Sequence, residues 1–311
     1  MYISLTFYLK DINRKKCSAV QGETLLQGQG KQEIIDIVRS KKTRIPTLPV
    51  VMNNIIATAR DKNTSARDLA KFITNDQAIS ARVLKIANSP YYGMSSKIDS
   101  ISRAIVVIGF REVISLALAT GVITSFAKSS TMDMTSLWKH SIGVGFASRI
   151  ILEQIGQKAK ESTMLIGLLH DLGKVIFSIY FPEEYARLLE NVSSKGLVLN
   201  KAEKESMGMD HAELASLIME HWNFPAHITE PIHFHHDPLS CPGKYKHMAM
   251  ILNIADFICH KAGIGSSGNH KVKKAIKVFA NVGLSPDDIL PLTRKLKDEE
   301  HNIEYFLEAL E

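Results

Sequence analysis

The sequence predicts an all-α protein in which a helical N-terminal lobe packs on a second helical domain. Apolar residues recur at helical spacing along most of the chain, as Val51, Ile55 and Ala59 do. No segment shows the strict alternation of apolar and polar residues that is typical of a half-buried strand. The chain has 311 residues, 45% of them apolar, which is enough for a sizeable core and for two compact domains.

The chain begins with a tail, which a lobe follows. Residues 1–30 have no helical pattern and are expected to be poorly structured. The helical lobe is expected over residues 31–130, and its first helix over residues 31–40. Pro46 and Pro49 disfavour the helical conformation in the residues before them, so an extended turn should follow that helix.

Capping residues mark the next helices of the lobe. Ser65 and Asp68 have the spacing of a capping box ahead of an apolar helical face. Asp76 can cap the following helix, which Pro90 ends. Residues 113–123 are small and aliphatic on every side, so a buried helix is expected there.

The second domain is expected over residues 131–262, after a polar, serine-rich stretch. Residues 263–268 are rich in glycine and serine and should break the last helix of this domain. Residues 263–311 are expected to form a C-terminal helical extension. Its helices should lie near residues 275–282 and 289–296 and in an acidic terminal segment.

Charge and cysteine content narrow the class of protein. The formal net charge is +6, but the basic residues are dispersed and do not form a stripe with aromatic residues, so a nucleic-acid partner is not expected. The three cysteines have no Cys-x-x-Cys spacing, which is typical of a reducing compartment. We find no signal peptide and no run of about 18 apolar residues that could span a bilayer. A cytoplasmic protein without a membrane partner is therefore expected.

An adjacent pair, His170 and Asp171, at the end of an apolar run is the most informative feature of the chain. An imidazole nitrogen and a carboxylate oxygen can bind the same divalent cation. Similar residues lie on either side of the pair, each on or beside an expected helix: His140, His211, His235, His236 and Asp256. Together they predict a site that binds metal or has descended from one that did.

Single members of this set have simpler interpretations. A lone histidine among apolar neighbours, such as His140, is more often a satisfied core residue than a ligand. Asp256 lies on an apolar helix, where a buried carboxylate needs a partner or a metal. Neighbours on a helix point about 100° apart, so His235 and His236 reach one site only if the helix ends or distorts there. The remaining histidines of this region are interpreted as structural or surface residues: His221, His227, His233, His247 and His260.

Two residues are candidates for a catalytic role. Asp171 is the best bridging ligand, because a carboxylate can contact two cations whereas an imidazole contacts one. Lys174, one turn later, could pair with a substrate phosphate or neutralise charge near the site. The cation would be Fe, Mn, Zn or Mg, and its bound water would supply a hydroxide nucleophile. A site that has lost its metal is the alternative.

Several motifs resemble the HDOD family, the HD-related output domain proteins of bacterial signalling. They are IPTLP at 45–49, IANSPYYG at 86–93, ISRAIVVIG at 101–109, GLLHDLGK at 167–174, GMDH at 208–211, WNFP at 222–225 and the histidine pair at 235–236. The resemblance covers residues 44–261. It implies an all-helical fold, with a helical lobe packed on an HD-like domain. It also implies a regulatory role, often beside receiver or cyclic dinucleotide-turnover domains.

Catalytic relatives of that family, the HD-GYP phosphodiesterases, hydrolyse cyclic di-GMP. The resemblance to them implies that the seven histidine and aspartate residues above are metal ligands and that Lys174 is the lysine of an HDxGK motif. Two departures argue against the same activity. The glutamate expected four residues before His140 is Ser136, and the segment over residues 237–245 lacks the GYP pattern.

The leading hypothesis is a signal-transduction module that acts through protein or ligand binding, with little or no catalysis. Its partners would be signalling proteins, or a nucleotide or cyclic dinucleotide. The alternative is a metal-dependent phosphohydrolase acting on a nucleotide or phosphate ester. Tyr91 and Tyr92 lie on an expected loop, where aromatic residues suit a protein interface. Packing between the two lobes is an equal alternative for them.

Overall fold

All regular secondary structure in the described residues is helical, which confirms the all-α prediction. The computed structural model describes Gln32, Ile34, Ile35 and residues 50–310, apart from short gaps at residues 62–63, 95, 127–130, 161, 270 and 272–275. The expected tail over residues 1–30, most of the expected helix over residues 31–40 and the turn at Pro46–Pro49 lie outside the described residues.

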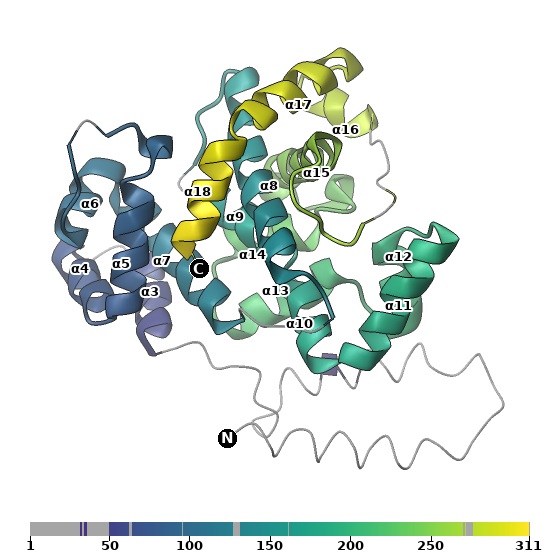
Figure 1. Cartoon of the computed structure of the whole chain (residues 1–311), viewed down its shortest axis with the longest axis horizontal. Coiled ribbons are helices and arrows are strands. Elements are labelled where there is room, and N and C mark those ends of the chain that lie inside the picture. Colours follow the sequence, from purple (N-terminus) through teal and green to yellow (C-terminus); the bar gives the residue numbers. More distant parts are fainter. Residues whose placement is uncertain are drawn as a thin grey trace, which may run out of the picture.

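The first group of helices lies at one side of the molecule, drawn in purple and blue (Figure 1). Its elements are α3 (Val50–Arg60), α4 (Ala66–Thr74), α5 (Gln77–Ala87), the 3₁₀ helix η1 (Pro90–Tyr92), α6 (Ile101–Ile108) and α7 (Phe110–Ser125). Helix α7 packs against α3, α5 and α6. Every residue from Val113 to Ile123 is buried, as the aliphatic composition predicts, because helices cover α7 on several sides.

Local capping explains where two of these helices begin. The hydroxyl of Ser65 accepts a hydrogen bond from the backbone N–H of Asp68 at 3.2 Å, and the Asp68 carboxylate accepts one from the Ser65 backbone at 3.3 Å. The Asp76 carboxylate accepts from the backbone N–H of Ile79 at 3.0 Å. Both predicted caps are confirmed, since they satisfy N–H groups that have no partner within the helix.

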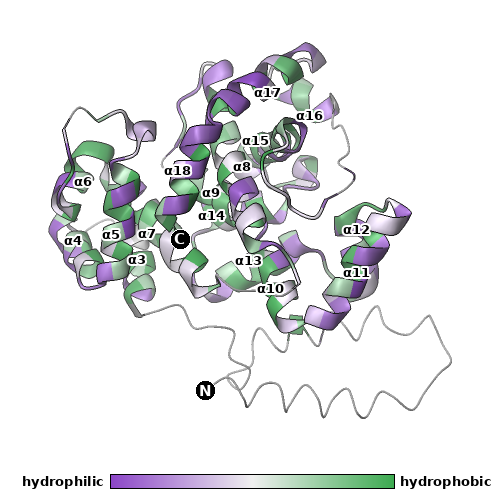
Figure 2. Cartoon of the chain, in the orientation of Figure 1, coloured by the Kyte–Doolittle hydropathy of each residue, from purple (hydrophilic) through white to green (hydrophobic). Residues whose placement is uncertain are grey.

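The second group of helices surrounds the histidine and aspartate residues. Helix α8 runs through it and packs against α9 and α15. In Figure 2, α9 and α15 are largely hydrophobic, whereas α11 and α17 carry hydrophilic faces. The elements are α8 (Met134–Gln154), α9 (Thr163–Leu169), α10 (Leu172–Tyr180), α11 (Pro182–Lys195), α12 (Leu199–Met207), α13 (His211–His221), α14 (Ala226–His233), η2 (Pro238–Ser240) and α15 (Gly243–Ala262).

The C-terminal helices contact both groups. They are α16 (Ile276–Asn281), the 3₁₀ helix η3 (Pro286–Asp288), α17 (Ile289–Asp298) and α18 (Glu300–Leu310). Helix α17 packs on α8 and α15, while α18 packs on α8, α5 and α7. The ammonium of Lys139 on α8 lies 2.8 Å from carboxylate oxygens of both Glu300 and Glu304. The end of the chain therefore lies across the two groups of helices.

Tyr91 lies in the contact between the two groups of helices. Its ring meets Phe146 of α8 and Phe306 of α18 edge to face, with centroids 4.8 and 6.0 Å away. The Arg149 guanidinium lies 4.3 Å from the centroid of the Tyr91 ring, within the range of a cation–π interaction. The Tyr92 hydroxyl donates to Glu112 at 2.7 Å. Of the two interpretations of this segment, the structure shows packing between the helical groups.

One segment of the described residues, Thr163–Tyr180, is long and apolar enough to cross a membrane, with a mean hydropathy of 1.3. Such a segment was not expected from the sequence. The molecule buries 89% of it, as a globular protein buries a core helix. The segment contains α9 and α10, so its apolar residues form the core around His170 and Asp171.

Candidate metal centre

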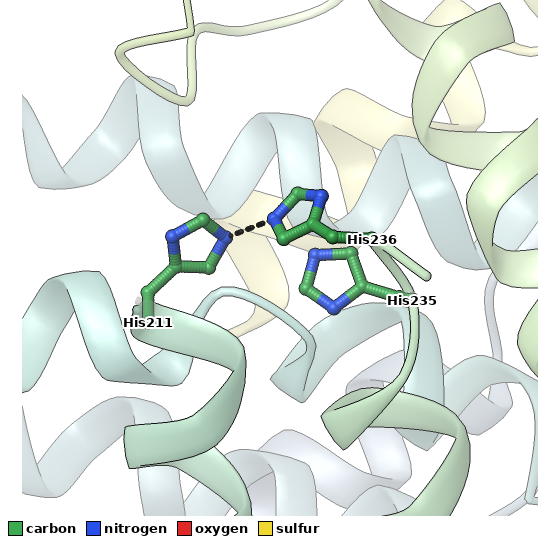
Figure 3. A group of neighbouring side chains, drawn as sticks. All are labelled: His211, His235 and His236. Atoms are coloured by element: carbon green, nitrogen blue, oxygen red, sulfur yellow. Dashed lines mark hydrogen bonds between the residues drawn. The ribbon is translucent and has the colours of Figure 1, made fainter. Parts of the chain in front are cut away.

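Five segments of the second group bring the seven predicted ligands together. His140 lies on α8, His170 and Asp171 at the corner between α9 and α10, and His211 at the start of α13. Helix α14 ends at His233, so the next two histidines lie in a turn and both face the cluster, as the nearby prolines favour. Figure 3 shows His211, His235 and His236 side by side. Asp256 comes from α15. All are buried except His236, which is half-buried.

Two glycines of the GLLHDLGK motif allow this corner to form. A Cβ atom on Gly167 would lie 2.4 Å from the backbone nitrogen of Gly145, so α9 touches α8 backbone to backbone. A Cβ on Gly173 would lie 2.0 Å from the carbonyl oxygen of His211, so α10 touches the start of α13 in the same way. These close approaches place Asp171 next to His211.

Backbone carbonyls fix the orientation of two histidine rings. Nδ1 of His170 lies 2.7 Å from the Gly167 carbonyl oxygen, and Nδ1 of His235 lies 2.7 Å from the Ile232 carbonyl oxygen. Because a carbonyl oxygen only accepts, Nδ1 carries the proton in both rings and Nε2 carries a lone pair. Both Nε2 atoms are buried without a hydrogen-bond partner. This arrangement is typical of metal-binding histidines.

A buried glutamate fixes the third ring. Nδ1 of His211 makes a short hydrogen bond to Glu203, which also accepts from the His211 backbone N–H at 3.0 Å. The Tyr185 hydroxyl donates to the other oxygen of Glu203 at 2.8 Å. Nε2 of His211 therefore faces Nε2 of His236, 2.7 Å away (Figure 3). Two ring nitrogens this close require a proton or a cation between them.

Asp171 lies at the middle of the cluster. Its carboxylate oxygens are 3.4 Å from Nε2 of His170 and 3.3 Å from Nε2 of His211. The ammonium of Lys174, which is fully buried, lies 2.7 Å from Oδ2. Although burial opposes ionisation, the interactions with His170 and with the ammonium of Lys174 hold the pKa of Asp171 well below its usual value. Lys174 thus forms a buried ion pair with Asp171.

Asp256 lies among three imidazoles. Its Oδ1 lies 3.0 Å from Nε2 of His140, 3.5 Å from Nε2 of His260 and 4.0 Å from Nε2 of His170. Nδ1 of His140 is buried without a partner. Burial disfavours a charge on His140, but the interactions with Cys259 and Asp256 outweigh it and raise the pKa of His140 to about 10.

The balance of charge in the cluster suits a divalent cation. The carboxylates of Asp171, Asp256 and Glu203 outnumber the ammonium of Lys174 and the protonated imidazole of His140, which leaves one negative charge in a buried space. Burial lowers the pKa of His170 to about 3 and of His260 to about 4. These imidazoles are therefore neutral and offer lone pairs, as metal binding requires. The residues fit a bound cation.

Comparison with known proteins identifies the fold family. A family model described as the HDOD domain matches residues 45–238, which is more than half of the chain. The chain belongs to the HDOD family. An HDOD domain protein of unknown function from Geobacter sulfurreducens has a TM-score of 0.73 and 23% identity, over 90% of this chain and 99% of that one.

Two further solved structures share the HDOD fold. A proposed phosphohydrolase from Shewanella amazonensis SB2B has a TM-score of 0.71 and 21% identity, over 93% of this chain and 100% of that one. A proposed signal transduction protein from Marinobacter aquaeolei VT8 has a TM-score of 0.72 and 19% identity, over 94% and 67%. At these identities the likeness shows the fold alone.

One curated relative is an uncharacterized protein of Treponema pallidum (strain Nichols). It is 26% identical over 203 residues, which cover 65% of this chain and 39% of the relative. The HDOD chain therefore spans about two fifths of the length of that protein.

Two members of the cluster in this HDOD protein were not expected from the sequence. His260, interpreted from the sequence as a structural or surface residue, lies beside the cluster, with its ring centroid 4.8 Å from that of His140. Its spacing of one turn from Asp256 was the available signal. Glu203 lies on a polar helix, and nothing local marks it as a partner of His211. The other four histidines lie outside the groups of potential ligands found among the described residues: His221, His227, His233 and His247.

Proposed function

We propose that this HDOD protein is a signal-transduction module whose histidine and aspartate cluster binds divalent cations, with little or no catalysis. The observation that carries the proposal is the pair of buried Nε2 atoms of His170 and His235, which have lone pairs and no hydrogen-bond partner. Leaving a buried polar atom unsatisfied costs about 1–3 kcal/mol, and a cation would remove that cost.

Four residues of the cluster would supply the ligand atoms for a cation. His170, His211 and His235 would offer Nε2, while Asp171 would offer carboxylate oxygens to one cation or to two. The Gly167 and Ile232 carbonyls and the Glu203 carboxylate keep the rings oriented. A bound cation lowers the pKa of a water ligand toward 7.

The poor access of a substrate to the buried cluster argues for a regulatory role and against hydrolysis. The side chains of His170, Asp171 and His211 expose 1%, 2% and 0% of their surface, and Lys174 exposes none. A phosphate ester needs to approach a metal-bound water, and these residues offer it no exposed edge. The partners proposed for the module are signalling proteins, or a nucleotide that acts as a regulatory ligand, in the cytoplasm.

A metal-dependent phosphohydrolase is the second candidate. Half-buried His236 favours it, because this ring lies against His211 and gives the cluster one edge toward the surface. The proposed phosphohydrolase from Shewanella amazonensis is consistent with it through its fold. Ser136 and the segment over residues 237–245 argue against hydrolysis of cyclic di-GMP, as described above.

Metal analysis and an activity screen test both candidates. Protein purified without chelators under reducing conditions should contain at least one equivalent of Fe, Mn or Zn, and Asp171→Ala should lose it. The loaded protein should not hydrolyse cyclic di-GMP or generic phosphodiesters faster than Asp171→Ala does. Metal-free protein that stays folded and takes up no added Mn²⁺, Fe²⁺ or Zn²⁺ would overturn the proposal. Turnover that depends on Asp171 would establish the phosphohydrolase instead.

A further inference from the structure

The cluster has two ends. At one end, potential ligand atoms of His211, His235 and His236 lie within 4.8 Å of one another. At the other end, those of His140, Asp256 and His260 do so as well. The pair His170 and Asp171 lies between the two ends, since Asp171 contacts His211 and His170 approaches Asp256.

We propose that His260 is a metal ligand, which together with His140 and Asp256 forms a second cation position in this protein. The inference rests on the proposed function, because it requires the cluster to bind cations. It adds a ligand that lies outside the predicted set, and it predicts two cations per chain.

The distances among the ligand atoms of His140, Asp256 and His260 fit a single cation that all three residues bind. Two ligand atoms about 2.1 Å from one tetrahedral zinc ion are about 3.4 Å apart. Oδ1 of Asp256 lies 3.5 Å from Nε2 of His260 and 3.0 Å from Nε2 of His140. The two histidines come from different helices, α15 and α8, as convergence on a site requires. Two imidazoles and one carboxylate make a set that suits Zn²⁺ or Fe²⁺, once the cation has displaced the proton that His140 shares with Asp256.

The segment that follows α15 lines this end of the cluster. The hydroxyl of Ser267, which is fully buried, lies 3.0 Å from Nε2 of His260, so a cation bound at this nitrogen would replace that hydrogen bond. The backbone N–H of Ser266 donates to the Ser136 carbonyl oxygen at 3.0 Å. Gly265 has a φ of +60°, and a Cβ there would lie 2.4 Å from the His140 backbone nitrogen. This segment therefore packs directly on the turn of α8 that carries His140.

His260 is also the member of this group nearest the surface. Its side chain is 17% exposed, whereas those of His140 and Asp256 are 0% and 7% exposed. Ser136, one turn before His140, offers only a hydroxyl group, so α8 supplies no second strong ligand here. His260 would therefore complete the second cation position. A cation would enter and leave this position past His260.

A zinc titration tests the proposal. Apo protein is titrated with Zn²⁺ against a chromophoric chelator, and bound zinc is counted by elemental analysis after desalting. Wild-type protein should bind two equivalents, and His260→Ala and His260→Gln should each bind one. The glutamine variant retains a polar side chain near Ser267, so it controls for loss of folding, which circular dichroism checks. His247→Ala is the matched control, because His247 lies on the same helix outside the cluster and its loss should leave two equivalents.

The outcomes separate this inference from the proposed function. If both His260 variants bind as much zinc as wild type with the same affinity, His260 is not a ligand, although the cluster binds metal. A wild-type protein that binds one equivalent, which the His260 variants retain, overturns the second position as well. If wild-type protein binds no zinc, both the proposed function and this inference fail.

Discussion

Gly173→Ala should open the junction between α10 and α13. A Cβ at this position would lie 2.0 Å from the His211 carbonyl oxygen, whereas ordinary contact begins at 3.4 Å. The two backbones would have to move apart by about 1.4 Å, and neither can rotate away as a side chain could. Overpacking of this kind costs about 3 kcal/mol, which lowers the melting temperature by roughly 6 to 12 °C.

Thermal and urea unfolding measure this change, and Gly243→Ala is its control. Gly243 begins α15, and a Cβ there would meet nothing within 4 Å. That variant should be neutral or more stable by up to about 1 kcal/mol. Metal affinity should also fall in Gly173→Ala, because Asp171 and His211, 3.3 Å apart, lie on opposite sides of the junction. If Gly173→Ala is as stable as Gly243→Ala and binds metal normally, the close approach does not hold the cluster together.

Three further changes test other parts of the structure. Lys174→Met leaves the buried charge of Asp171 without its partner, so the free energy of unfolding of the metal-free protein should fall by about 3–5 kcal/mol. Added Zn²⁺ should restore part of this stability. An equal loss with and without Zn²⁺ would contradict this reasoning. Glu203→Gln weakens the hydrogen bond that orients His211, so metal affinity measured by chelator competition should fall about 10- to 100-fold, and unchanged affinity would count against that role. Ser65→Ala removes the cap of α4 and should cost about 1 kcal/mol in urea unfolding without changing metal binding.

Local sequence signals predicted much of the fold. Caps such as Asp76, and the buried helix over residues 113–123, depend on residues a few positions apart and can be read directly. The cluster was predictable for a different reason. Its residues lie far apart in the sequence, but they occur in an order that resembles a known family, and the structure brings all seven together.

Contacts that depend on tertiary packing could not be predicted in this way. Glu203 reaches His211 only because α12 and α13 pack together, and its polar neighbours give no sign of burial. Helix α18 has the composition of an ordinary amphipathic terminal helix, and its packing on both α5 and α8 follows from the arrangement of the other helices. Tyr91 was assigned to a loop, whereas the residues that cover it, Phe146 and Phe306, lie far along the chain.

Helix α8 carries residues of both the cluster and the contact between the two groups of helices. His140 belongs to the cluster, while Phe146 and Arg149, about 9 and 13 Å further along the axis, contact Tyr91 of the first group of helices. An α-helix of 21 residues with buried neighbours behaves as a stiff rod, so a tilt at one end displaces the other end. A cation that moved His140 would therefore act on the helix that also contacts Tyr91, so the proposed site and the contact between the helical groups share one element.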